Sequence, residues 1–192
     1  MTVTFYSVSR LGEFTVPAIK RFDAHIHITR ANISQSTNHD NLEVVSFNIP
    51  RTKCAPTGET THIAPIPHLT NQVEWLHNHF RINNPSHNDH LFAWRHQKGI
   101  RPLTKLEVTL RIKEIVLQHS LPDLKGHSLR IGGTLHYLLQ GTPFEVVKTM
   151  GRWSGESFTL YLRHHALILA PYLHEHQDRA IQLNQFMLPP VR

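Results

Sequence analysis

The sequence contains a single cysteine, Cys54, among 192 residues. One thiol excludes a disulfide within the chain and a zinc cluster built on cysteines. Chains without disulfides are typical of reducing compartments, so we expect an intracellular protein.

Acidic residues are also scarce. The sequence has 14 Asp and Glu against 20 Lys and Arg, which gives a formal net charge of +6. The acidic residues form no group suited to Mg²⁺, which disfavours metal-dependent nucleases and transposases. We therefore expect neither a metal nor another cofactor, and the excess of positive charge favours a polyanionic partner.

Long apolar runs are missing as well. The longest, residues 166–173, is too short to span a bilayer, and the first residues lack the layout of a signal peptide. We expect a soluble protein with no membrane partner. With 40% hydrophobic residues, 192 residues suffice for one domain and a short tail.

Histidine, in contrast, is abundant, with 17 residues. Pairs such as His25 and His27, or His77 and His79, have spacings that occur in zinc sites. Such short matches arise by chance in a histidine-rich chain, so we interpret these side chains as solvated.

Hydrophobic periodicity predicts a mainly α protein of α+β class with one small antiparallel sheet. Three segments rich in β-branched residues are predicted as its strands: 23–29, 42–49 and 60–66. Residues 4–14 are predicted as a short helix. The pattern is helical again from Leu69 onward, around 73–80 and then, after an exposed loop at 83–88, in the short piece 91–96.

Capping signals divide the C-terminal half into helices. Thr104 and Glu107 can form a capping box, which predicts a helix to about Gln118. A further helix is predicted over 124–140, ending at Gly141.

The same device recurs at Thr142–Glu145, with Pro143 at the first helical position. Gly151 is expected to end this helix near Met150. A last helix is expected to begin near Gly155.

The chemistry-bearing residues lie mainly in the C-terminal half. His127 and Arg130 share one face of the predicted 124–140 helix, where both can converge on one phosphate. Trp153 and, eight residues later, Tyr161 follow. The stretch HSLRIGGTLHYLLQGTPFEVVKTMGRWSGESFTLYLR resembles the motifs of tyrosine recombinases, the phage-integrase family, in which a His-x-x-Arg helix, a His or Trp and a nucleophilic Tyr occur in that order. The wording GRWS and YLR is most similar to recombinases of fungal mobile elements such as Cryptons.

Two upstream segments extend the resemblance. Arg10 followed by Glu13 is similar to the family's first box, which implies Arg10 as the first catalytic arginine. Glu13 would support it by orienting its guanidinium, or would be a surface carboxylate at a helix end. Residues 48–53 resemble the family's strand hairpin, whose lysine reaches the cleaved phosphodiester; this implies Lys53, with Arg51 as the alternative.

The resemblance assigns residues 1–175 to a tyrosine-recombinase catalytic domain and 176–192 to a C-terminal helix or tail. Because Arg10 lies so close to the first residue, we expect the family's N-terminal core-binding domain to be absent from this sequence.

The implied function is DNA integration or recombination, by cleavage and rejoining of strands through a covalent 3′-phosphotyrosine. A tyrosine hydroxyl has a pKa of about 10, so it needs cations or a base nearby. Paired guanidiniums suit the charge that develops on the phosphate, and a lysine can protonate the leaving oxygen. The implied catalytic residues are Arg10, Lys53, His127, Arg130, Trp153 and Tyr161.

Alternatives stay open at this point. The chain is also compatible with a catalytically inactive DNA-binding module of the same fold, or with a type IB topoisomerase-like enzyme. Trp153 equally suits a hydrophobic core, and Tyr161 a ring that is buried with its hydroxyl in water. The expected partners are double-stranded DNA and a second copy of the chain on that DNA, and the resemblance alone implies the nucleus.

Overall fold

A computed structural model describes residues 1–155 of the chain. The chain divides into two compact units, residues 1–130 and 131–192, with the boundary inside helix α4. The helices are α1 (Thr2–Tyr6), α2 (Gln72–Asn83), α3 (Lys105–Gln118), α4 (Gly126–Leu139) and α5 (Phe144–Gly151). The strands are β1 (Ile33–Thr37), β2 (Glu43–Ile49), β3 (Glu59–Ile63), β4 (Trp94–His96) and β5 (Gly99–Arg101). The described residues are therefore of mixed α+β class.

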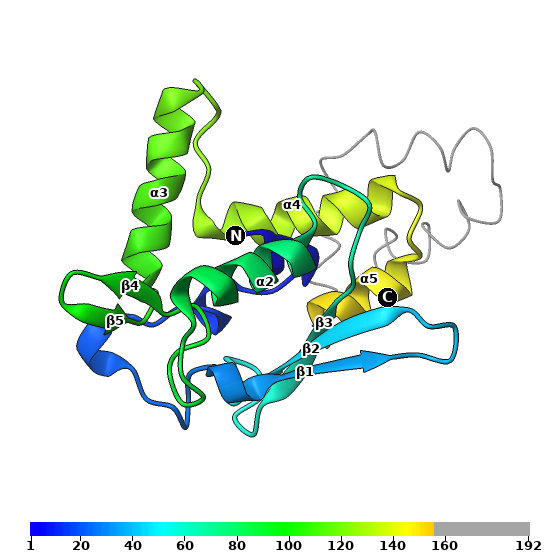
Figure 1. Cartoon of the computed structure of the whole chain (residues 1–192). Helices are drawn as coiled ribbons and strands as arrows, with labels where there is room; N and C mark the ends of the chain where they lie inside the picture. The colour runs from blue at the N-terminus through cyan, green and yellow to red at the C-terminus, as the bar shows by residue number, and fades with distance from the viewer. Residues whose placement is uncertain (156–192) are drawn as a thin grey trace, which may run out of the picture. The chain divides into compact units, whose positions relative to one another are not determined.

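The first unit is built on an antiparallel sheet with strand order β1-β2-β3. Val45, Phe47 and Ile49 alternate along β2 and are buried, so one face of the sheet belongs to the core. Helix α2 lies beside this sheet (Figure 1), and Gln35 of β1 hydrogen-bonds His77 of α2 at 2.8 Å. The predicted sheet is thus present.

Strands β1 and β2 join through an exposed turn at residues 38–42. The Asn38 side-chain oxygen accepts the backbone N–H groups of Asp40 and Leu42, at 3.0 and 2.8 Å. Asn41 adopts a left-handed conformation, with φ of 58°, which asparagine tolerates better than most residues.

The first strand was predicted in the wrong place. Residues 23–29 form a turn, because the backbone N–H of His25 donates to the Asp23 carboxylate and that of His27 to the Asp23 carbonyl, at 2.9 and 2.8 Å. Local bonding by the Asp23 side chain thus competes with strand formation. The strand that pairs with β2 begins at Ile33 instead.

Two predicted helical segments also differ. The helix expected over 4–14 is α1 followed by a short 3-10 turn, η1 (Leu11–Glu13), because the chain turns at Val8, where φ is 50°. The piece 91–96 contributes β4, which pairs with β5 as a hairpin; Gly99, with φ of 101°, supplies the left-handed residue of its turn.

The remaining helices of the first unit confirm the capping signals. In α3 the Thr104 hydroxyl accepts the Glu107 N–H at 3.2 Å, and the Glu107 carboxylate accepts the Thr104 N–H at 2.9 Å. The predicted helices 73–80 and 124–140 correspond to α2 and α4.

The second unit corrects one cap. Helix α5 has Pro143 as its N-cap and no side-chain capping bond, because proline offers neither an N–H nor a side-chain acceptor. The predicted box of Thr142 and Glu145 does not form. Arg152, not Gly151, takes the left-handed position after the helix, with φ of 56°. Gly151 is needed for a different reason: the Trp153 ring occupies the space that a Cβ at Gly151 would fill.

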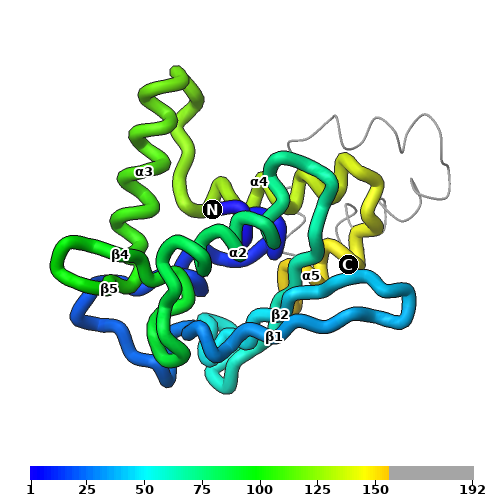
Figure 2. Tube along the Cα trace, in the orientation of Figure 1, coloured from blue at the N-terminus to red at the C-terminus, as the bar shows by residue number. Residues whose placement is uncertain are grey.

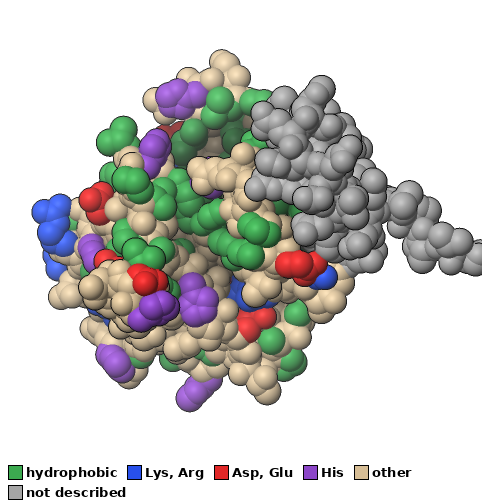
Figure 3. Space-filling view, turned by 90° about the vertical axis from the view of Figure 1, so that its right-hand side faces the viewer, with side chains coloured by type: hydrophobic (Ala, Val, Ile, Leu, Met, Phe, Trp, Pro, Cys, Tyr) green, Lys and Arg blue, Asp and Glu red, His purple; other side chains and the backbone are tan. Residues whose placement is uncertain are grey.

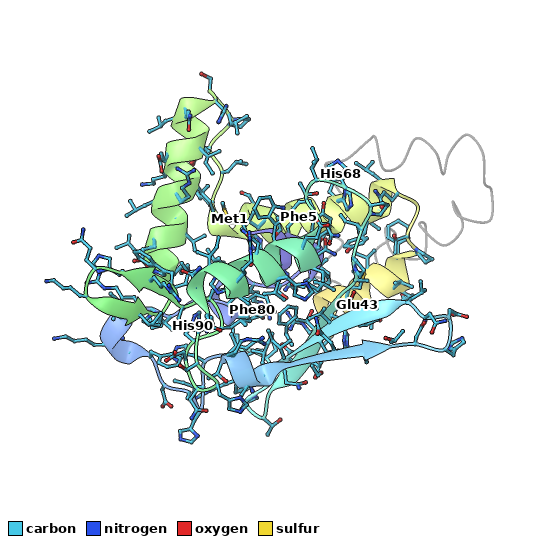
Figure 4. The ribbon with its side chains drawn as sticks, viewed as in Figure 1. Met1, Phe5, Glu43, His68, Phe80 and His90 are labelled. Atoms are coloured by element: carbon cyan, nitrogen blue, oxygen red, sulfur yellow. The ribbon has the colours of Figure 1, made fainter. Side chains whose placement is uncertain are left out.

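A buried histidine lies near the C-terminal part of α2, where Figure 4 labels Phe80 and His90. His90 is 1% exposed, and its ring centroid is 5.8 Å from that of Phe22. Burial, and then the nearby charges of His27 and His79, lower the pKa of His90 to about 4. This histidine is therefore neutral at physiological pH.

Within residues 1–155, each helix falls short of the length and apolarity that crossing a membrane requires.

Candidate functional site

Arg10 is held at the start of η1 by Glu13. The Arg10 guanidinium donates to one Glu13 carboxylate oxygen at 3.0 Å, and the Arg10 backbone N–H donates to the other at 2.9 Å. Glu13 is 8% exposed. Of the two roles considered for Glu13, the geometry fits the one that orients Arg10.

Arg10 carries a positive charge. Burial acts to lower the pKa of Arg10, but the hydrogen bond and the charge of Glu13 outweigh it and leave the pKa above its ordinary value. A second N–H of the guanidinium donates to the Cys54 sulfur at 3.4 Å. Arg10 thus contacts the loop between β2 and β3.

This connection, residues 50–58, can be followed in Figure 2. The Thr52 hydroxyl accepts the N–H of Ala55 at 3.0 Å. Gly58 closes the loop with φ of 88°, and a Cβ there would lie 2.7 Å from the Ile49 carbonyl oxygen. Glycine is therefore required at that position.

Arg51 and Lys53 of this loop line an open hollow of about 410 Å³, which we call the loop hollow. Both candidates for the hairpin cation are thus present in it, and the structure does not separate them. The remaining residues that line it are Arg10, Gly12, Glu13, Ile26, His27 and Thr52.

A second hollow of about 540 Å³, which we call the helix hollow, shares Arg10 and Gly12 with the loop hollow. It brings together three predicted site residues, Arg10, His127 and Arg130, although more than 100 positions separate the first from the others. Arg130 is only 2% exposed. The other residues that line it are Leu11, Lys105, Thr109, Lys125 and Gly126.

Helix α4 explains why His127 and Arg130 share the hollow. They are three apart in its first turns and so lie on one face. Burial, followed by the positive charges of Arg130 and Arg10, lowers the pKa of His127 below the ordinary value. A neutral imidazole beside two guanidiniums can accept a proton from a hydroxyl group.

Two predicted site residues lie elsewhere in the chain. Trp153 is in the second unit, where its ring packs against Gly151. Tyr161 falls outside the described residues, as do the helix expected after Gly155 and the tail at 176–192.

Sequence reasoning missed Lys105 and Lys125, both of which line the helix hollow. A signal was present, since each lies at the start of a predicted helix, where cations are unusual. His27, interpreted as a solvated strand residue, lines the loop hollow instead.

The histidines are spread over the face that Figure 3 shows. Within residues 1–155, no group of three or more His, Cys, Asp or Glu side chains is arranged to hold a metal ion.

No protein-family model matches the sequence, and no curated protein matches it significantly.

Proposed function

We propose that this chain cleaves and rejoins DNA through Tyr161, as a tyrosine-recombinase catalytic domain. The observation that carries the proposal is the helix hollow, in which Arg10, His127 and Arg130 meet. These are three residues of the family's motifs, and they come from distant parts of the sequence. The mixed α+β fold with its small antiparallel sheet is compatible with such a domain.

The hollow suits a phosphodiester that is under attack. Two guanidiniums offer paired donors in fixed directions to the non-bridging oxygens, where negative charge grows in the transition state. Glu13 keeps one of them in place. The Arg10 guanidinium is therefore oriented before the reaction begins.

The proton transfers follow from the other residues. His127, neutral at pH 7, accepts the proton of the Tyr161 hydroxyl as the phenolate oxygen bonds to phosphorus. The bond from phosphorus to the sugar 5′ oxygen breaks, and Lys53 donates a proton to that oxygen. The indole N–H of Trp153 is proposed as a further hydrogen-bond donor to the phosphate. The covalent 3′-phosphotyrosine retains the phosphodiester energy, so a 5′ hydroxyl end can reverse the steps without ATP.

The proposal extends to the partners. A polyanionic duplex fits a chain with net charge +6, and exchange between two DNA duplexes calls for more than one copy of the chain. The nucleus is proposed from the resemblance alone.

The test is incubation with a nicked suicide DNA duplex, followed by denaturing gel electrophoresis. We expect a covalent protein–DNA adduct with the wild type and with Tyr172→Phe, a matched control. Tyr161→Phe should form none.

Persistence of the adduct in Tyr161→Phe would overturn the assignment of the nucleophile. Binding without any adduct would favour the inactive DNA-binding module. Relaxation of supercoiled DNA without strand exchange between duplexes would favour the topoisomerase.

A further inference from the structure

The helix hollow is lined by more cationic side chains than the binding of one phosphate group requires. Lys105 and Lys125 line it together with Arg10 and Arg130, and none of the described residues that line it is acidic. A water molecule takes about 30 Å³ in the liquid, so a hollow of about 540 Å³ has room for more than one phosphate group. The chemistry proposed above leaves the two lysines without a role.

Both lysines lie at positions where the local electrostatics disfavour a positive charge. Lys105 is the first residue of α3, and Lys125 directly precedes the first residue of α4. Helix N-termini carry partial positive charge, so a cation there is unfavourable. Such conflicts between local preference and structure are found mainly at functional sites, and an anion between the lysines would relieve this one.

Both lysine side chains are open to solvent. Lys125 pairs with Asp123 at 3.5 Å, but the two side chains are 78% and 73% exposed. An exposed ion pair of this kind contributes little in water, so a phosphate group can replace the aspartate.

The two hollows share a rim. Arg10 and Gly12 line both of them. A Cβ built on Gly12 would meet no atom within 4 Å, so the space above this residue is open. A phosphate group can therefore approach the rim at Gly12.

We propose that one DNA strand crosses the Arg10–Gly12 rim from the loop hollow to the helix hollow. Lys105 and Lys125 hold the phosphate next to the one that Arg10 and Arg130 bind. This inference rests on the proposed function and adds the path of the strand and a second phosphate position.

The first test measures binding of the full chain to a fluorescent DNA duplex of arbitrary sequence over a series of salt concentrations. Lys105→Gln and Lys125→Gln should each reduce the slope of log K against log salt, and the double variant should reduce it by about 0.9, because the two lysines together neutralise one phosphate. Lys113→Gln is the matched control: it removes an exposed lysine of the same helix that lines neither hollow, and its slope should equal the wild type's.

Arg10→Gln separates this inference from the function on which it rests. If Arg10→Gln weakens binding while both lysine variants keep the wild-type slope, the second phosphate position is wrong and the proposed function stands. If Arg10→Gln also binds as the wild type does, both the second phosphate position and the proposed phosphate contact of Arg10 are wrong.

The path across the rim is tested by Gly12→Ala. Because the added methyl group meets open space, the melting temperature should stay within experimental error of the wild type's. DNA affinity at fixed salt should fall severalfold, since the methyl group intrudes on the strand. Unchanged affinity would overturn the path.

Discussion

The surroundings of Arg10 and of His90 both gather basic side chains, but they treat the charge in opposite ways. At Arg10 a buried carboxylate supports the cation, whose side chain remains 31% exposed. At His90 the ring is enclosed, and burial together with neighbouring histidines suppresses its charge. The first arrangement keeps positive charge available for a ligand, whereas the second uses a basic residue as part of the packed core.

Replacing Arg10 by lysine should have the strongest effect on the proposed reaction. Arg10→Lys keeps a positive charge beside Glu13 but loses the paired donors of the guanidinium. We expect adduct formation to slow by about 10²–10³-fold, the usual cost of losing one donor to a transition state. Single-turnover kinetics on the suicide duplex measures the rate.

His90→Asn is the control from the other region. The side-chain oxygen of the introduced asparagine can still accept the Phe92 N–H, which donates to His90 Nδ1 at 3.2 Å in the wild type. The rate of adduct formation by this variant at neutral pH should match the wild type's. A comparable loss of rate in both variants would break the distinction between the two regions.

The stability of the folded chain should depend on pH through His90. Below about pH 6.5 the unfolded chain protonates at residue 90, whereas folded His90 resists protonation until about pH 4. Stability is therefore lost as the pH falls through this window, by on the order of 3 kcal/mol. Urea unfolding at several pH values measures it.

In His90→Asn this part of the pH dependence should be missing. If the variant and the wild type lose the same stability between pH 6.5 and 4, His90 is not the group responsible.

The smallest expected effect is that of the Arg10 charge on the pKa of His127. Because the charge of Arg10 contributes to lowering the pKa of His127, after burial and Arg130, Arg10→Gln should raise that pKa towards its ordinary value. NMR titration of the His127 ring in both proteins measures the change. An unchanged titration would mean that the two side chains are not electrostatically coupled.

The elements that sequence patterns predicted well are those whose cause is local. Thr104 and Glu107 satisfy each other's backbone groups within one turn, so α3 was found with its cap. Strand β1 was misplaced because strand formation depends on a distant partner, while residues 23–29 satisfy their own bonds through Asp23.

The residues of the candidate site also differ in whether the sequence could reveal them. The order of motif residues along the chain pointed to Arg10, His127 and Arg130, which line one hollow. The position of Lys105 at a helix start was a signal, but the local sequence does not show that this helix begins beside Arg10. Which residues line a hollow depends on how the chain packs, and the spacing of residues along the sequence does not determine this.

The exposed turn at residues 38–42 is a suitable site for attaching a label. It closes on its own Asn38 bonds at one end of β2, and the loop of Arg51 and Lys53 leaves the other end. Seven strand residues place these ends about 20 Å apart. A fluorophore or surface tether attached at Asp40 would therefore report on DNA capture, or immobilise the chain, without occupying either hollow.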